Sequence, residues 1–220
     1  MMITKILILC MLIFASPVYA YDWVSELDIA QDPDLKQIVT VKGTKGSEAE
    51  FALHEKDSGG WYEVVTCKAY IGKKGFGKTR EGDMKTPQGM FAFTKAFGIE
   101  DDPGSVMYYT KVDDSHYWVG DSQSEYYNQL VSTKDFEDFN KKASEHIIDY
   151  KQAYKYCLNI NYNEDGVPNR GSAIFLHCQT DNKFTAGCVA IPEKDMIKVL
   201  KHVNSECVII MDTDKNIMNY

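Results

Sequence analysis

The sequence is poor in basic residues and has no cluster of them. Its 220 residues include 24 Lys and Arg against 32 Asp and Glu, so the formal net charge is -8. Binding to nucleic-acid phosphates requires clustered Lys and Arg, and the chain has neither a basic tract nor a basic stripe interleaved with aromatic residues. We therefore expect no nucleic-acid partner. With 44% hydrophobic and 25% charged residues, the composition is that of an ordinary globular protein.

Long apolar segments are missing after the first 20 residues, so no transmembrane helix is predicted there. Residues 1–20 have the pattern of an export signal. Lys5 gives a positive start, residues 6–15 form an apolar run too short to span a bilayer, and residues 18–20 are typical of a cleavage site. We predict an exported protein of the periplasm, cell wall or extracellular space, with a mature chain of residues 21–220.

Internal repeats, coiled-coil heptads and Ser/Pro-rich linkers are also missing. Removing residues 1–20 leaves a length that supports one substantial hydrophobic core. The sequence therefore predicts a single domain, which we expect to be a monomer.

Short β-type segments separated by turn residues make up most of the chain, so the predicted fold class is mainly β, of the β-rich α+β kind. The Asp57-Ser58-Gly59-Gly60 segment is a hairpin signal between two of them. Apart from residues 113–150, two helices are predicted, one within residues 23–35 and one after Pro192, with Met196, Leu200 and Val203 on one face. The predicted strands cover residues 38–42, 48–56, 61–70, 90–93, 156–162, 173–176 and 207–211.

One segment, at about residues 113–150, differs from the rest in its many tyrosines and polar residues. Its second half, residues 134–150, has helical spacing, with Phe136, Phe139, Ala143 and Ile147 on one side. We interpret the segment as an aromatic and helical insertion that covers a cleft, with Tyr117, Trp118, Tyr126 and Tyr127 as its aromatic residues.

Cysteines are few, and the sequence has no Cys-x-x-Cys pair. Cys10 belongs to the predicted signal, which leaves an odd number of thiols in an exported chain. A reactive thiol is one explanation for an odd count, whereas Cys67, Cys157 and Cys207 have the pattern of small buried residues. Disulfide pairing is left open for Cys67, Cys157, Cys178 and Cys207.

The candidate site is a buried strand that ends at His177, a short polar loop, and Gly187-Cys188 at the start of the next apolar segment. A thiol close to an imidazole is converted more easily to a nucleophilic thiolate, and the protonated ring then supplies a proton to a leaving amine. Gly187 permits close approach of the backbone, and neighbouring N–H groups are suited to an oxyanion hole.

Zinc binding is the competing interpretation of these residues, because His177, Cys178 and Cys188 are all possible ligands. Adjacent residues of a strand point to opposite faces, so His177 and Cys178 would not converge on one ion. We therefore favour a thiol nucleophile. A buried and inert Cys–His pair is a further alternative.

Two motifs carry a family resemblance. His177 followed by Thr185-Ala186-Gly187-Cys188-Val189 resembles the active-site signature of the L,D-transpeptidase catalytic domain, the YkuD-like family. The run Gly77-Lys78-Thr79-Arg80-Glu81-Gly82-Asp83-Met84-Lys85-Thr86-Pro87-Gln88-Gly89 resembles the loop that precedes a core strand in that family. The resemblance covers about residues 38–211.

The resemblance implies a β-sandwich of mixed sheets with a few peripheral helices, and an enzyme acting on peptidoglycan stem peptides without a metal or organic cofactor. Cys188 would attack a stem tetrapeptide and form a thioester with release of D-alanine, and a neighbouring stem would then give a 3-3 cross-link. His177 would be the general acid and base. Gly187 would line the oxyanion site with the N–H of Cys188, and Thr185 would support it by hydrogen bonding.

The sequence departs from the family pattern at Cys178, Ala186 and Ala190. Ala190 stands where the family often has an arginine, and Arg80 and Arg170 are the nearby positive residues, although both have the pattern of surface residues. We expect the loop of residues 77–89 to support the fold. Two alternatives stay open: an L,D-carboxypeptidase that hydrolyses the same bond, and a cell-wall binding module without turnover.

Overall fold

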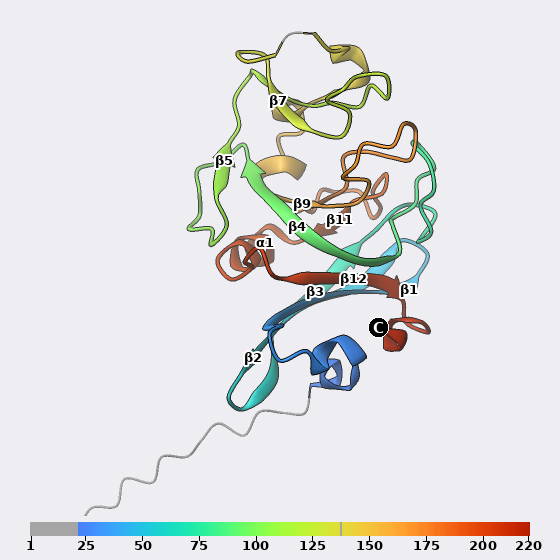
Figure 1. Ribbon diagram of the computed structural model, residues 1–220, viewed down its shortest axis with the longest axis vertical. Coiled ribbons are helices and arrows are strands. Elements are labelled where there is room, and N and C mark those ends of the chain that lie inside the picture. The colour runs from blue at the N-terminus through green and yellow to red at the C-terminus, as the bar shows by residue number, and fades with distance from the viewer. Residues whose placement is uncertain (1–21, 137) are drawn as a thin grey trace, which may run out of the picture.

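The computed structural model describes residues 22–136 and 138–220 (Figure 1). The predicted export signal, residues 1–20, lies outside this part of the chain. Within it, the secondary structure is dominated by strands. They are β1 (Gln37–Lys45), β2 (Glu48–Asp57), β3 (Gly60–Tyr70), β4 (Gly89–Gly98), β5 (Tyr109–Lys111), β6 (His116–Trp118), β7 (Leu130–Ser132), β8 (Glu145–His146), β9 (Cys157–Ile160), β10 (Phe175–Cys178), β11 (Val189–Ile191) and β12 (Val208–Thr213).

The main sheet has the strand order β12-β1-β2-β3-β11-β10-β9-β4-β5, and β12 also pairs with β4. The strands β12-β1-β2-β3 form one layer and β11-β10-β9-β4 the other (Figure 1). Pairing is parallel for β1–β12, β10–β11 and β4–β5 and antiparallel elsewhere. The predicted mainly β fold with mixed sheets is confirmed.

The hydrophobic core lies between the two layers. Val39 and Val41 of β1 face this core, whereas Ile38 belongs to a second apolar cluster on the outer side. This division follows the period of two along a strand, because successive side chains point to opposite faces. The predicted helix within residues 23–35 is two 3-10 helices, η1 (Trp23–Glu26) and η2 (Asp28–Gln31). Val24 of η1, Ala30 of η2 and Leu27 between them belong to this outer cluster.

The predicted second helix is α1 (Glu193–Leu200), which follows Pro192. Met196, Leu200 and Val203 are all buried in the main core, as the spacing predicts, and α1 contacts β3 and β10. It is the one α-helix in the described ranges; η3 (Lys141–Ala143), η4 (Ile147–Asp149), η5 (Ala153–Lys155) and η6 (Ile217–Asn219) are 3-10 helices. None of the helices placed in residues 22–136 and 138–220 has the length and apolar character needed to cross a membrane.

The predicted helix over residues 134–150 is wrong. The described part of this segment forms η3, β8 and η4, and β8 joins β6 and β7 in a separate three-stranded sheet at the top of Figure 1. Of the four apolar residues expected on one helix face, Ile147 is buried, but Ala143 and Phe136 are exposed. A short helix is marginal without a buried face, and pairing of β8 with β6 satisfies the backbone instead.

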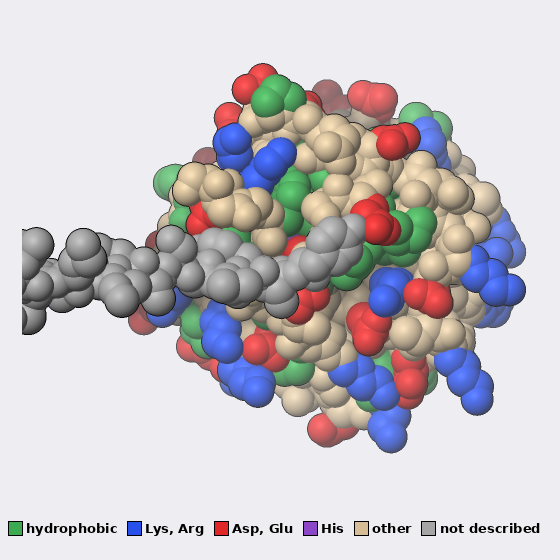
Figure 2. Space-filling model, turned by 90° about the horizontal axis from the view of Figure 1, so that it is seen from below, with side chains coloured by type: hydrophobic (Ala, Val, Ile, Leu, Met, Phe, Trp, Pro, Cys, Tyr) green, Lys and Arg blue, Asp and Glu red, His purple; other side chains and the backbone are tan. Residues whose placement is uncertain are grey.

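Charged side chains of both signs are interspersed on the face shown in Figure 2. Lys and Arg lie next to Asp and Glu there, and the basic residues do not form a continuous patch on this face. This arrangement agrees with the absence of a basic tract in the sequence.

Candidate active site

Strands β10 and β11 bring His177 and Cys188 to one cavity. They pair in parallel with Leu176 opposite Val189, so Cys188 lies beside Phe175 and His177 lies two residues further along β10. The N–H of Phe175 donates to Cys188 Sγ at 3.4 Å, and Sγ donates to the carbonyl of Ala173 at 3.2 Å. Both His177 and Cys188 line a cavity of about 530 Å³.

His177 is held in one tautomer. Its Nδ1 lies 2.9 Å from the carbonyl oxygen of Cys178, and because a carbonyl only accepts hydrogen bonds, Nδ1 carries the proton in the neutral ring. Burial lowers the pKa of His177 to about 4, so the ring is neutral at pH 7. Within the described residues nothing hydrogen-bonds to Nε2, which is therefore available as a base. The residue that orients His177, left open by the sequence, is Cys178 through its backbone.

Cys188 is a neutral thiol in this structure. Burial, followed by the nearby Glu145 carboxylate, raises the pKa of Cys188 to about 12. No hydrogen bond joins His177 to Cys188 in the part of the chain described, and such contacts are often longer in the absence of substrate. The pair is thus a thiol and a neutral imidazole in one cavity, and attack by sulfur would have to accompany proton transfer to Nε2.

The turn before Cys188 is held by two threonine hydroxyls. Thr185 Oγ1 donates to the carbonyl of Cys188 at 2.7 Å and accepts from the N–H of Gly187 at 3.1 Å. Thr86 Oγ1 donates to the same carbonyl at 3.4 Å. Gly187 has φ +156°, and a Cβ there would lie 2.8 Å from the carbonyl oxygen of Lys85. Gly187 and Thr185 therefore shape the backbone around the thiol, and the N–H of Gly187 is occupied by Thr185.

The loop of residues 77–89 does more than support the fold, because it also lines the cavity with Lys78. The Lys78 side chain is only 2% exposed, and its Nζ lies 3.1 Å from Asp83 Oδ1. Burial alone would raise the pKa of Asp83, but the N–H groups of three loop residues and the Lys78 ammonium hold it at about 2. Lys78 Nζ also lies 3.6 Å from the position that a Gly187 Cβ would occupy.

Lys78 is thus a positively charged residue of the cavity wall, close to Gly187. Arg80 and Arg170 are exposed, as surface residues are. Sequence reasoning missed Lys78, although the Lys78–Asp83 spacing within the glycine-rich run was a visible signal of a local ion pair.

The insertion contributes Trp118, Glu145 and Tyr150 to the cavity wall, and Tyr154 lines the cavity just beyond it. Tyr154 packs edge-on against the His177 ring, with ring centroids 5.6 Å apart. The other predicted aromatic residues lie elsewhere: Tyr117 stacks on His146, Tyr126 packs on Phe136, and Tyr127 donates to Glu81. Glu145 was not predicted from the sequence, because its segment was interpreted as a helix.

The arrangement of cysteines does not form a zinc site at His177. All five cysteines of the described chain are free thiols. Cys178 packs in the main core and its Sγ lies 3.8 Å from the carbonyl of Tyr156, whereas Cys188 belongs to the cluster around Phe175. The two sulfurs therefore lie on opposite faces of the sheet, as strand alternation predicts.

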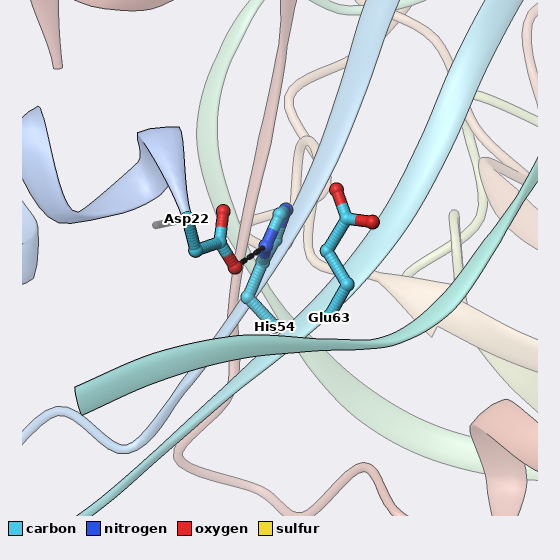
Figure 3. Close-up of side chains that lie close together, drawn as sticks. All are labelled: Asp22, His54 and Glu63. Carbon is cyan, nitrogen blue, oxygen red and sulfur yellow. Dashed lines mark hydrogen bonds and ion pairs between the residues drawn. The ribbon is translucent and has the colours of Figure 1, made fainter. Parts of the chain in front are cut away.

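A second polar cluster lies on the outer face of the other layer, where His54 of β2 stands between Asp22 and Glu63 (Figure 3). His54 Nδ1 lies 2.6 Å from Asp22 Oδ2, and Nε2 lies 3.1 Å from Thr40 Oγ1. Both nitrogens of His54 thus have hydrogen-bond partners, one of them at the start of the described chain, so we interpret the cluster as an anchor for the N-terminal segment.

Comparison with known proteins identifies the family of the chain. A family model described as the L,D-transpeptidase catalytic domain, YkuD, matches residues 41–211, which include both motifs. No curated protein matches the chain.

Among solved structures, Bd1075 of Bdellovibrio bacteriovorus is 14% identical with a TM-score of 0.43, and the match covers 81% of this chain and 48% of that one. The helical cell shape determining protein Pgp2 of Campylobacter jejuni is 16% identical with a TM-score of 0.43, with the same coverage of 81% and 48%. An L,D-transpeptidase (Yku) of Stackebrandtia nassauensis is 13% identical with a TM-score of 0.36, covering 83% and 58%. The chain thus spans about half the length of the first two structures. Because the family model matches well over half of the sequence, the chain belongs to the YkuD family of L,D-transpeptidase catalytic domains.

Proposed function

We propose that this chain is an exported cysteine acyltransferase that acts on the stem tetrapeptides of peptidoglycan. The observation that carries the proposal is the shared cavity of Cys188 and His177, in which the Cys178 carbonyl selects the tautomer with a basic Nε2. The family acts on peptidoglycan, and membership together with the predicted export signal supports an envelope location and a stem-peptide substrate.

The first half-reaction transfers the stem to sulfur. Cys188 Sγ attacks the carbonyl carbon of the diamino acid that precedes the terminal D-alanine, and His177 Nε2 takes the thiol proton. When the tetrahedral intermediate collapses, the C–N bond breaks and His177 returns the proton to the departing amine of D-alanine. The product is a thioester at Cys188.

The oxyanion of this intermediate needs positive groups close to the nucleophile. The backbone at Gly187 and the N–H of Cys188 are the proposed donors, with Thr185 holding the turn in place. Because the N–H of Gly187 donates to Thr185 in the free protein, it would have to exchange that partner for the oxyanion. The buried Lys78 ammonium beside Gly187 adds a fixed positive charge to the same region.

The second half-reaction decides the product. An amine from a neighbouring stem attacks the thioester and gives a 3-3 cross-link, with His177 as base. If water attacks instead, the same site is an L,D-carboxypeptidase, so the masses of muropeptide products distinguish the two.

The first test is the intact mass of the protein after incubation with a carbapenem, a class of β-lactam that acylates this family. We expect one adduct on the wild-type chain, none on Cys188→Ala, and an unchanged adduct on the matched control Cys178→Ala. An adduct on Cys188→Ala would contradict the assigned nucleophile. If the wild type forms no adduct and leaves muropeptides unchanged, the chain is a binding module rather than an enzyme.

A further inference from the structure

Glu145 places a carboxylate in the wall of the Cys188 cavity. It lies on β8, opposite Trp118 of β6, so the sheet of the insertion determines its position. Its Oε2 accepts a hydrogen bond from the hydroxyl of Tyr154 at 2.7 Å. In the ranges that the structure describes, no Lys, Arg or His lies within ion-pair distance of it. The cavity wall therefore holds an acid that forms no ion pair within the described residues, since the Lys78 ammonium in the same wall is paired with Asp83.

The contrast with Asp83 shows what the Glu145 carboxylate lacks. Asp83, in the loop that contributes Lys78 to the cavity wall, is paired with Lys78 and three backbone N–H groups. Glu145 has one neutral partner, and burial, with a smaller effect of Glu81, raises its pKa to about 7. A desolvated carboxylate without a counter-ion destabilises the folded state, so a purely structural role would be served better by an amide.

The position of Glu145 also disfavours the reactive, deprotonated form of Cys188. Its negative charge raises the pKa of Cys188 and so opposes formation of the thiolate. Glu81, a second acid of the cavity wall, binds Tyr127 and Ser172 and likewise has no cation in the described ranges. The negative charge next to the thiol would be neutralised by a positively charged group that arrives with a ligand.

We propose that Glu145 binds a primary ammonium group of a stem peptide beside the acyl group on Cys188. The inference rests on the proposed function, and it assigns the residue that selects amine-bearing stems. The ammonium has two possible sources: the side chain of the diamino acid in the donor stem, or the amine of the acceptor stem before it attacks. A carboxylate suits either one, since ammonium–carboxylate hydrogen bonds are among the stronger ones in proteins.

The test compares wild type with Glu145→Gln, which keeps the acceptor for Tyr154 but removes the charge. Glu125→Gln is the matched control, because it makes the same change at an exposed position of the same insertion. Donor tetrapeptides are used with the side-chain amine of the diamino acid free or N-acetylated, with and without an acceptor stem. The readouts are the rate of D-alanine release and the mass ratio of cross-linked to hydrolysed product.

If the donor supplies the ammonium, Glu145→Gln lowers kcat/KM for D-alanine release about tenfold for the free-amine donor and leaves the acetylated donor unchanged. If the acceptor supplies it, D-alanine release is unchanged and the ratio of cross-linked to hydrolysed product falls about tenfold. If both readouts of Glu145→Gln equal those of the control Glu125→Gln, the assignment of Glu145 is overturned and the proposed function is left intact. A wild-type chain that releases no D-alanine would remove both proposals.

Discussion

Two buried histidines of this protein differ in how many of their nitrogens have partners. His54 is 0% exposed, and both its nitrogens are engaged, by Asp22 and Thr40. His177 is 7% exposed, and one nitrogen is engaged by the Cys178 carbonyl while the other is left to the cavity. A histidine with two internal partners stabilises the fold, whereas one with a single orienting partner and a free nitrogen is equipped for proton transfer.

The acids near these histidines differ in the same way. Asp22 accepts the N–H of Val24 at the start of η1 with one oxygen and pairs with His54 through the other. Glu145, near His177, has Tyr154 as its partner and no cation in the described ranges. Asp22 is therefore fully paired within the protein, whereas Glu145 keeps hydrogen-bonding capacity on the cavity side.

The largest effect is expected when either residue of the cavity pair, His177 or Cys188, is substituted and the activity is measured. Cys188→Ala and His177→Gln should each lower D-alanine release by at least about a thousandfold, because nucleophile and base act as one unit. Their thermal unfolding should stay close to that of wild type, since His177 has one internal partner to lose. His177→Gln retaining more than a tenth of wild-type activity would show that this histidine is structural as well.

The neutral state of the cavity pair predicts how Cys188 reacts with a small alkylating agent. With the thiol pKa raised to about 12, the thiolate fraction should grow about tenfold per pH unit, so alkylation should accelerate about a thousandfold from pH 7 to pH 10. Mass mapping of the Cys188 peptide after iodoacetamide treatment measures this rate. A plateau below pH 8 would instead show a thiolate–imidazolium pair in the free protein.

Substitution of His54 should lower the stability of the protein and leave its activity unchanged. His54→Ala leaves Asp22 buried without its partner, and we expect a loss of about 3 kcal/mol in the free energy of unfolding. His202→Ala is the control, because this exposed histidine pairs with Glu55 at the surface and should cost less than about 0.5 kcal/mol. Urea denaturation measures both, and activity per folded molecule should be unchanged in either variant. An equal cost for the two would contradict the anchoring role.

The smallest effect on the free energy of unfolding is expected for substitution of Glu145. It should stabilise the protein, whereas substitution of His54 should destabilise it. Its folded pKa, raised to about 7 from 4.5, means that the folded state holds the proton more tightly. The contribution of Glu145 to stability is therefore fully present below about pH 4.5 and is lost as the pH rises through about 7. Glu145→Gln should raise the free energy of unfolding by about 1 kcal/mol at pH 8, a value discounted for partial exposure, and leave it unchanged at pH 4. Melting temperatures at the two pH values measure this, and destabilisation at pH 8 would contradict it.

The sequence predicted some elements well and one badly. The hairpin at residues 57–60, the strands on either side and the buried face of α1 follow from turn chemistry and periodicity, which are local properties. The segment of residues 134–150 has helical spacing too, but β8 pairs with β6 about 27 residues earlier. A local pattern does not record that competing partner.

The residues of the site also divide into those that a local pattern predicts and those that depend on contacts between distant segments. His177 and Cys188 could be chosen from the sequence because each lies at the end of an apolar run and a motif surrounds them. Lys78 and Glu145 could not, since they reach the cavity from a loop and an insertion far away in the chain.

The sequence alone determined the β-rich class and the family, and it singled out His177 and Cys188 for the proposed chemistry, because strand period and motif spacing are properties of consecutive residues. Only the tertiary structure decided which histidine keeps a free nitrogen and which charges face the thiol. Those properties depend on desolvation and on hydrogen-bond partners, which exist only once distant segments have packed together.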